Sequence, residues 1–479
     1  MDKDFYIHKT NNYIFIINMR NGDFTHISKS ELNQADESTL INLKKQSLVS
    51  HANQSMDEFS LDNVKVLFLS IHASSNCNLK CRYCFRDFNN QSTDLPTEEI
   101  KVFLDNAIKM YRNLEKIIVD PSGSGEPLMN MELLEYIGAY CKEKSDELSI
   151  EVLPMLVSNG LLLDETNVSR LRKSGILFGV SIDGNRKQHD VNRQDVHHQD
   201  TYKKIMKNLK HIKDKSLLGA AVTLNASNLD IISIYESLIN FFPTISVKPA
   251  RSNTIYGINQ SNIDSALKAY TDFAEFLIKK SMNGDLRYIA AMLNGDDYFG
   301  KFLSRIILKQ AVSTRCDAGF GRLSLSYDKK IYACPAAIGI SELQVGSLSE
   351  GVDEKKQRFI YELQMSRSKC GSCPAKFVCG GECLVNSYYS TGKIDVLDNV
   401  MCKLKRHLYW QSQIVYAYLL ENNPRLLNIL YEWSLEKANR FNIDHEINDV
   451  LQKHPEYTFT TIKSLKDHHD PKFDQLKSK

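Results

Sequence analysis

From residue 64 to residue 260, short β-rich runs alternate with stretches of helical periodicity. The β-rich runs are 64–71, 116–120, 151–157, 176–182, 220–224 and 245–247, and the helical stretches are 97–111, 131–144, 165–173, 202–213 and 229–241. Consecutive strands joined through a helix pair in parallel, because a parallel connection needs a long crossover. The alternation therefore predicts an α/β core built on one parallel sheet, either open or curled into a partial barrel.

Further segments lie outside this core, as expected for a chain of 479 residues, which is too long for one ordinary domain. Residues 1–60 read as a small α+β unit, with strands at 5–7 and 13–17, turns at Asn11-Asn12 and Asn21-Gly22, a helix over 28–45 and a closing segment at 47–49. After the core come a helical linker over 261–312, a cysteine-rich segment over 313–403 and a helical tail over 404–479.

The charge of the chain excludes one class of partner. There are 60 Lys and Arg residues against 58 Asp and Glu residues, so charge gives no reason to expect binding to nucleic acid or to an anionic membrane. No uncharged apolar run is long enough to span a bilayer, and residues 1–5 lack the apolar stretch of a signal peptide. We therefore expect a cytoplasmic protein with no membrane and no nucleic-acid partner.

The 11 cysteines carry the strongest chemical signal. In a reducing compartment disulfides are disfavoured, so clustered cysteines indicate metal or redox chemistry. Cys141 stands apart in a helical pattern, and we interpret it as a buried structural thiol. The other ten fall into two groups, one within 77–84 and one within 316–402.

The first group has the spacing Cys77-x3-Cys81-x2-Cys84 on a loop just after the first predicted strand. Three thiolates can bind three corners of an iron–sulfur cubane, and without a fourth cysteine nearby one iron keeps an open site. The alternative is zinc, although structural zinc sites prefer four protein ligands. This spacing, with Tyr83 and Phe85 flanking Cys84, resembles the signature of the radical S-adenosylmethionine (SAM) superfamily. The resemblance implies a 4Fe–4S cluster that binds SAM.

Other motifs resemble that family in its order and at successive strand ends. They are Ser122-Gly123-Ser124-Gly125-Glu126-Pro127, Ser158-Asn159-Gly160, Ser181-Ile182-Asp183-Gly184, His189-Asp190 and Arg193, with Ser124 in place of a family glycine. Ligands of parallel α/β sheets bind at these ends. The resemblance implies that Glu126 meets the SAM amino group, that Asp183 lies near the ribose and that Arg193 binds the carboxylate. It implies a SAM-binding set of Tyr83, Phe85, Ser124, Gly125, Glu126, Pro127, Asn159, Ser181, Asp183 and Arg193.

The second group comprises Cys316, Cys334, Cys370, Cys373, Cys379, Cys383 and Cys402. Its core, Cys370-x2-Cys373-x5-Cys379-x3-Cys383, resembles the SPASM extension of some radical SAM enzymes, which holds one or two auxiliary 4Fe–4S clusters. The resemblance implies one cluster on Cys370, Cys373, Cys379 and Cys402, and another on Cys316, Cys334 and Cys383 that lacks a fourth cysteine. Lys329 stands where the family has a turn glycine, although Asp328 can still initiate the turn. Zinc is again the alternative, because Cys-x2-Cys pairs also occur in zinc ribbons.

Together the resemblances imply a partial (β/α)6 barrel with a C-terminal iron–sulfur SPASM domain and the small N-terminal unit. They imply an oxidoreductase that uses a 5′-deoxyadenosyl radical to abstract hydrogen, with a flavodoxin- or ferredoxin-type electron donor. Most SPASM enzymes modify peptides, and residues 1–60 read either as a reduced leader-recognition domain or as a structural cap. We expect a maturase that installs a thioether or carbon–carbon cross-link in a ribosomally made precursor peptide.

Other functions stay open. One is dehydrogenation of a small molecule, and another is a zinc protein without enzymatic activity. Anaerobic sulfatase maturation is disfavoured by two departures from that group. No cysteine stands between Cys316 and Cys334, and Pro335 replaces the acidic residue that would follow Cys334. No general base can be assigned from these patterns.

Overall fold

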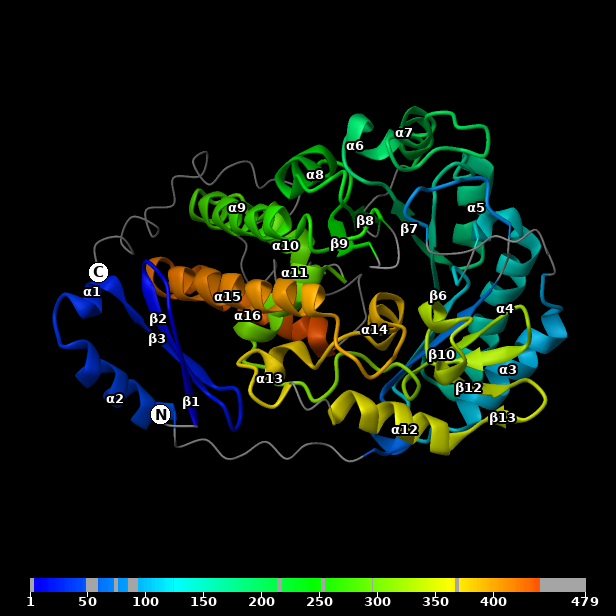
Figure 1. Ribbon diagram of the computed structural model, residues 1–479. Helices are drawn as coiled ribbons and strands as arrows, with labels where there is room; N and C mark the ends of the chain where they lie inside the picture. Colours follow the sequence, from blue (N-terminus) through cyan, green and yellow to red (C-terminus); the bar gives the residue numbers. More distant parts are fainter. Residues whose placement is uncertain are drawn as a thin grey trace.

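Six parallel strands, paired in chain order, form a sheet in the right half of the molecule as drawn in Figure 1. The computed structural model describes residues 4–48, 59–72, 76–84, 94–123, 125–212, 218–250, 255–294, 296–366 and 370–439. The six strands are β4 (Val66–Ile71), β5 (Lys116–Asp120), β6 (Glu151–Ser158), β7 (Leu177–Ser181), β8 (Gly219–Leu224) and β9 (Thr244–Pro249). Every pairing between neighbours in this set is parallel. The predicted α/β core on a parallel sheet is confirmed.

The five expected helices are present as α3 (Thr97–Lys109), α4 (Met131–Leu148), α5 (Glu165–Lys173), α7 (Tyr202–Lys210) and α8 (Ile231–Leu238). Helix α8 starts later than its periodicity predicts, because the side chain of Asp230 accepts a hydrogen bond from the Ser233 amide and caps the helix there. The sequence reading missed α6 (Arg186–Asp190), a five-residue helix opened by a capping box between Asn185 and Gln188.

The two faces of the sheet differ in burial. Leu67 and Val119 are fully buried in one hydrophobic cluster with Phe103 of α3. Along β6 and β8 the alternate residues, such as Met155 and Ala221, are only partly buried. Because successive side chains of a strand point to opposite faces, the partly buried set lines the inner face of the partial barrel.

Four more strands continue this sheet beyond β4. They are β10 (Arg322–Leu325), β11 (Lys330–Tyr332), β12 (Gln344–Ser347) and β13 (Gly351–Val352), of which β10 is parallel to β4 and the rest are antiparallel. Strands β10 and β11 flank the turn predicted at Asp328, and they extend the core sheet. In this turn Lys329 adopts a φ of 62°, the left-handed conformation that a glycine would take without strain, and the Lys330 amide donates to Asp328 Oδ1 at 3.3 Å.

The N-terminal unit contains a small antiparallel sheet, in the order β1-β2-β3. Its elements are β1 (Phe5–Lys9), β2 (Tyr13–Asn18), β3 (Phe24–Ser28), α1 (Lys29–Leu32) and α2 (Glu37–Leu48). The sequence predicted the first two strands but not β3. This strand lies directly before the segment over which a helix was expected, 28–45. That helix is instead divided, because Asp36 Oδ2 accepts from the Thr39 amide at 2.9 Å and starts a second helix. Residue 49 of the expected closing segment lies outside the described residues.

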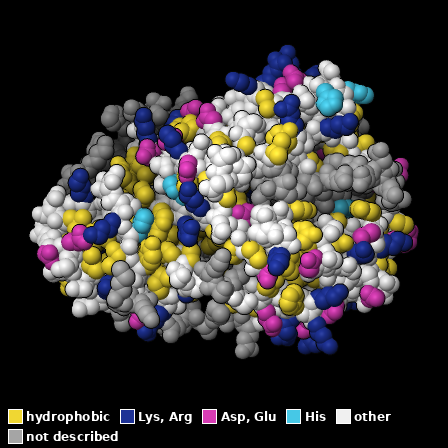
Figure 2. Space-filling view, viewed as in Figure 1, with side chains coloured by type: hydrophobic (Ala, Val, Ile, Leu, Met, Phe, Trp, Pro, Cys, Tyr) yellow, Lys and Arg dark blue, Asp and Glu magenta, His cyan; other side chains and the backbone are white. Residues whose placement is uncertain are grey.

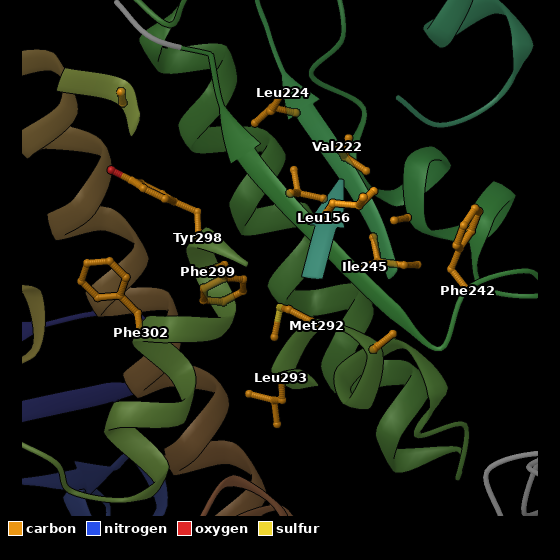
Figure 3. Packing of buried hydrophobic residues seen from close by; sticks show 14 of the residues in the cluster. Leu156, Val222, Leu224, Phe242, Ile245, Met292, Leu293, Tyr298, Phe299 and Phe302 are labelled. Carbon is orange, nitrogen blue, oxygen red and sulfur yellow. The ribbon is translucent and has the colours of Figure 1, made fainter. Parts of the chain in front are cut away.

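Helices fill the space between the small sheet and the large one (Figure 1). They are α9 (Ile263–Met282), α10 (Arg287–Asn294), α11 (Tyr298–Ile307), α12 (Glu354–Met365), α13 (Lys376–Cys379), α14 (Leu384–Thr391), α15 (Asn399–Asn422) and α16 (Pro424–Asn439). Met292 of α10, Phe299 of α11 and Ile245 of β9 belong to one hydrophobic cluster, part of which is drawn in Figure 3. Of the helical tail predicted over 404–479, residues 404–422 and 424–439 lie in α15 and α16, and residues 440–479 lie outside the described residues.

The N-terminal sheet packs against helix α15. Trp410 stacks on His8 with 3.8 Å between ring centroids, and Phe24 meets Tyr416 at 5.4 Å. The opposite face of the small sheet packs against α2, where Ile16 joins a separate hydrophobic cluster. Strand β2 is consequently buried on both faces, so this unit is fixed to the rest of the chain by apolar packing.

The surface carries both signs of charge, and Figure 2 shows them distributed over the visible face. Among the helices that the structure describes, none combines the length and the apolar character needed to cross a bilayer.

Candidate active site at the strand ends

The loop with the first three cysteines is held by backbone pairing with a second loop. The amide of Lys80 donates to the Gln194 carbonyl at 2.8 Å, and that of Arg82 donates to the Asn192 carbonyl at 2.9 Å. A β-bridge joins Leu79 to Asp195, next to the first of these bonds. The cysteine loop therefore follows β4 but takes its shape from the segment after β7.

The three thiols of this loop act on one another electrostatically. Burial raises the pKa of Cys77 to about 11, and the charge of Cys84 adds to that increase. Burial raises the pKa of Cys81 to about 12, with further contributions from Cys84 and Cys77. Thiols with such pKa values remain protonated at neutral pH unless a metal binds the thiolate form. The loop thus offers three closely spaced thiols suited to a shared metal group.

Glu126 joins the loops that follow β5 and β6. Its buried carboxylate accepts from Ser158 Oγ at 2.8 Å, from the Asn159 amide at 2.7 Å and from the Leu128 amide at 3.2 Å. Burial raises its pKa, and these donors oppose the increase. The acidic residue is present at the predicted strand end. Its predicted contact with the SAM amino group stays a prediction.

Asn159 connects this carboxylate to the cysteine loop. Its Nδ2 donates to Asn78 Oδ1 at 2.6 Å and lies 4.0 Å from Cys77 Sγ. Nearby, Gly125 has a φ of 65° and Pro127 is buried at the start of a 3-10 turn. Ser181 ends β7, partly buried. Two members of the predicted SAM-binding set, Phe85 and Ser124, lie outside the described residues.

A buried ion pair closes the site on the side of β7 and β8. Asp183 Oδ2 accepts from Tyr83 Oη at 2.5 Å and from Arg193 Nε at 3.0 Å, while Oδ1 accepts from the Thr223 amide at 3.0 Å. Arg193 also lies over the Tyr83 ring, at 5.3 Å from its centroid, and its Nη1 is 3.9 Å from Cys81 Sγ. Burial opposes the charge of Arg193, but Asp183 and Tyr83 raise its pKa, so it stays charged.

His189 orders the backbone behind this ion pair. Its Nδ1 accepts from the Asp183 amide at 3.3 Å and its Nε2 lies 3.0 Å from Thr201 Oγ1, whose proton goes to the Arg193 carbonyl. This network assigns the ring proton to Nε2. Burial lowers the pKa of His189 to about 4, so the ring is neutral at pH 7. The sequence reading missed Thr201 and Thr223, which carry no local motif.

The second group of cysteines lies where β10–β13 meet α13–α15. Burial raises the pKa of Cys316 with Cys383 as the next contributor, and raises that of Cys373 with a contribution from Cys379. For Cys402 burial raises the pKa to about 12, with Glu382, Cys379 and Cys370 adding to it. Cys334 precedes a 3-10 turn that starts at Pro335. These pairs occur within the two ligand sets that the resemblance implied, and the ligand assignment itself stays a prediction.

The side chains present fit the cofactors that the motifs imply. Three partly buried thiols suit an iron–sulfur cluster, which binds thiolates, and buried Glu126 next to glycine backbone suits a cationic amine. Within the described residues, no group of three or more His, Cys, Asp or Glu side chains is arranged to hold a single metal ion.

Comparisons with known proteins show what this chain is similar to. Residues 71–227 match the model of the radical SAM superfamily. The cysteine-type anaerobic sulfatase-maturating enzyme of Clostridium novyi is 24% identical over 363 residues, which cover 69% of this chain and 91% of that protein. The serine-type enzyme of Klebsiella aerogenes is 21% identical over 336 residues, covering 64% of this chain and 76% of its own.

A solved structure shares the fold. The structure of anSMEcpe with bound AdoMet and Cp18Cys peptide has a TM-score of 0.59 and 18% identity, and the match covers 76% of this chain and 99% of that one. The partial barrel with its parallel sheet is therefore confirmed, together with the antiparallel N-terminal sheet and the cysteine-rich C-terminal region. The chain thus carries a radical SAM match over residues 71–227 and is similar at low identity to the anaerobic sulfatase-maturating enzymes.

Proposed function

We propose that this enzyme is a maturase that cross-links a ribosomally made precursor peptide through a thioether or a carbon–carbon bond. Two kinds of observation support the proposal. Its relatives are named for the maturation of other proteins, the sulfatases, and its N-terminal sheet has an open edge that an extended peptide can join. The second observation carries the proposal.

The open edge belongs to β3. The Lys29 amide donates to the Asn12 carbonyl and the Asn18 amide to the Asp23 carbonyl, which fixes the alternation of hydrogen bonds along β2 and β3. Phe24 and His26 therefore direct their backbone groups away from β2. Within the described residues β3 pairs only with β2. Such an edge is a template for an added strand, the mode by which many domains bind extended peptides.

A hollow beside this edge favours β3 over β1 as the docking strand. It measures about 200 Å³ and is lined by residues from both sides of the junction, Asn21, Gly22, Asp23, Phe24, Leu48, Arg305, Ile306, Lys309, Gln310, Ala311, Phe377 and Val378. Gly22 is required here, because a Cβ would stand 2.6 Å from Phe377 Cβ. A peptide added to β3 would run along the wall formed by α11 and α13, toward the second group of cysteines.

In the proposed reaction the chain's residues bind, orient and exclude water. Cys77, Cys81 and Cys84 would hold a 4Fe–4S cluster, and with SAM bound this cofactor supplies the 5′-deoxyadenosyl radical that removes one hydrogen atom from the peptide. Glu126 and Asn159 hold the cysteine loop against β6. Arg193 and Asp183 close the opposite side. The peptide loses two hydrogen atoms overall: one to the radical, and one as a proton and an electron when the new bond forms.

The departing electron needs an acceptor near the peptide. The seven cysteines from Cys316 to Cys402 offer the ligands for one or two auxiliary clusters. We propose that Cys370, Cys373, Cys379 and Cys402 would hold a cluster that supplies this acceptor, and that a flavodoxin- or ferredoxin-type partner would take up the electron afterwards. The test is activity after replacing Cys370 and Cys379 with alanine. Full product formation by that variant would contradict this part of the proposal.

The experiment for the whole proposal uses the enzyme reconstituted with iron and sulfide, SAM and a chemical reductant. Its candidate substrates are synthetic versions of the short peptides encoded next to its gene. Loss of two hydrogen atoms from one peptide, with a cross-link located by fragmentation, is the expected result. Formation of 5′-deoxyadenosine with conversion only of a sulfatase-derived cysteine or serine peptide would instead identify the second candidate, sulfatase maturation, which the named relatives favour.

Leader binding has its own test. His26→Pro removes an outward N–H from β3 without touching the ladder to β2, and we expect it to weaken binding of a fluorescent precursor peptide at least tenfold. His26→Ala is the control for the lost side chain, and Ile7→Pro makes the equivalent change at the β1 edge. Equal weakening by His26→Pro and Ile7→Pro would argue against β3 as the docking strand.

A further inference from the structure

A buried cluster of charged side chains lies beside both sets of auxiliary cysteines. Its centre is an ion pair in which Lys405 Nζ stands 2.5 Å from Glu382 Oε2, and the side chains are 2% and 0% exposed. Lys405 Nζ also donates to the Gly381 carbonyl at 3.2 Å. Ion pairs with so little exposure are rare, because the cost of desolvating both charges often exceeds their attraction. Stability alone therefore does not explain this ion pair.

Each member of the pair adjoins a different set of cysteines. Glu382 directly precedes Cys383, and its Oε1 accepts from the Cys383 amide at 2.8 Å. Lys405 follows Cys402 by three residues on α15, so the two lie on one face of that helix. The pair thus joins the cysteine set that includes Cys402 to the set that includes Cys383.

Arg315 brings a second positive charge to the same place. It precedes Cys316, and its guanidinium carbon lies 5.0 Å from the centroid of the Tyr298 ring. The loop at Gly380 fixes this proximity, because a Cβ there would stand 2.4 Å from the Thr314 carbonyl. Glycine at φ 66° is the residue that permits the approach. Arg315 therefore lies against the Cys379–Cys383 loop.

The three groups carry two positive charges and one negative charge. The ammonium of Lys405 is in direct contact with the carboxylate of Glu382, and the guanidinium of Arg315 stays protonated as it does in proteins generally. The net charge of the cluster is consequently one positive charge in a region with little solvent to screen it.

Tyr298 completes the cluster from α11. It is 8% exposed, and within the described residues its hydroxyl has no hydrogen-bond partner. Figure 3 shows this hydroxyl pointing away from Phe299 and Met292, out of the hydrophobic cluster. Arg315 lies over the ring of this phenol, so Tyr298 borders the charged group on the side of α11.

We propose that the Glu382–Lys405–Arg315 cluster sets the reduction potentials of the auxiliary iron–sulfur clusters. Iron–sulfur clusters on thiolate ligands are anionic and gain negative charge on reduction, so a nearby positive charge stabilises the reduced form and raises the potential. The net positive charge of the three residues therefore makes the auxiliary sites better electron acceptors. This inference rests on the auxiliary clusters of the proposed function.

The sign of the effect provides the test. Glu382→Gln raises the net charge of the three residues, and Lys405→Met removes it. We expect the auxiliary potential, measured by redox titration monitored with electron paramagnetic resonance, to rise in Glu382→Gln and to fall in Lys405→Met. The double variant Glu382→Gln/Lys405→Met restores the original net charge and removes the unpaired partner, so its potential should return toward that of the wild type.

Controls distinguish an effect of charge on the potential from a change in folding or in cluster content. Lys268→Met removes one partner of an exposed pair, in which Lys268 Nζ is 2.6 Å from Asp272, and should leave the potential unchanged. Iron and sulfide content is measured on every variant in a Cys77/Cys81/Cys84→Ala background, so that only auxiliary clusters report. Shifts in the same direction for both single variants, no shift at full iron content, or loss of iron from all three variants would overturn the inference. A wild-type protein without auxiliary iron would refute the proposed clusters themselves.

Discussion

The phenol of Tyr83 donates a 2.5 Å hydrogen bond to Oδ2 of Asp183, one hundred residues further along the chain. Tyr83 belongs to the cysteine loop and Asp183 follows β7, so this bond connects the loop of the proposed cluster ligands to the opposite side of the barrel. The same oxygen accepts from Arg193 Nε. A buried carboxylate that accepts two such hydrogen bonds holds the cysteine loop in position.

Tyr83→Phe should loosen this loop. The change removes one donor from a carboxylate that keeps Arg193 and the Thr223 amide, so we expect a loss of about 1–3 kcal/mol in the free energy of unfolding. Iron bound at the first three cysteines should fall in parallel. Urea unfolding and iron analysis check both effects. Tyr431→Phe, at a side chain that is 43% exposed on α16, is the matched control.

Arg193→Met should have a larger effect. It leaves Asp183, which is 0% exposed, without its countercharge, and removing one partner of a buried pair costs about 3–5 kcal/mol. Arg193 also lowers the pKa of Cys81 against the larger effect of burial, so its loss disfavours the thiolate that binds metal. We expect thermal unfolding at a lower temperature and reduced iron content.

The double variant Asp183→Asn/Arg193→Met tests whether the loss of stability comes from the unpaired charge of Asp183. Because it removes both charges, it should recover part of the stability that Arg193→Met loses. Equal stability of the single and double variants would show that Arg193 acts through packing over the Tyr83 ring and not through its charge.

Much of the core was predictable from local sequence, and the active-site contacts were not. Strand β5 reads as Lys-Ile-Ile-Val-Asp, a buried apolar run, and was predicted with its observed bounds. Strand β3 reads as Phe-Thr-His-Ile-Ser and was missed, because its burial comes from α15, where His26 meets Glu421 at 3.1 Å. No local pattern reports a partner nearly 400 residues away.

In the candidate site, too, the sequence predicted the residues but not the contacts between them. Motif spacing found Glu126, Asp183 and Arg193, each of which is buried at a strand end. Spacing did not predict that Asp183 and Arg193 bind each other, since a motif gives the residue and its place on the fold but not its rotamer. Thr223 contributes through its backbone amide, which any residue possesses, so side-chain identity carried no signal there.

His189 gives the enzyme a pH dependence of stability. Its pKa is about 4 in the folded protein against 6.5 for the free side chain, so between these values the unfolded state binds the proton and the folded state does not. Stability from this group is therefore complete above pH 6.5 and is lost as pH falls toward 4, by on the order of 3 kcal/mol. Unfolding free energies of wild type and His189→Gln, compared over this range, should differ in slope. Parallel curves would contradict the assignment.

Trp410→Ala should release the N-terminal sheet from α15. The indole stacks on His8 at 3.8 Å and lies 6.5 Å from Phe15, so its loss removes the central contact between the two units. We expect a cost of about 2–4 kcal/mol, because a large aromatic side chain is truncated at a partly buried position. Amide hydrogen exchange in β1 and β2 should accelerate while β4 and β5 keep their protection. Leu420→Ala, at a side chain that is 38% exposed on the same helix, should change neither. Uniform acceleration in all four strands would show that the N-terminal unit and the barrel unfold as one body.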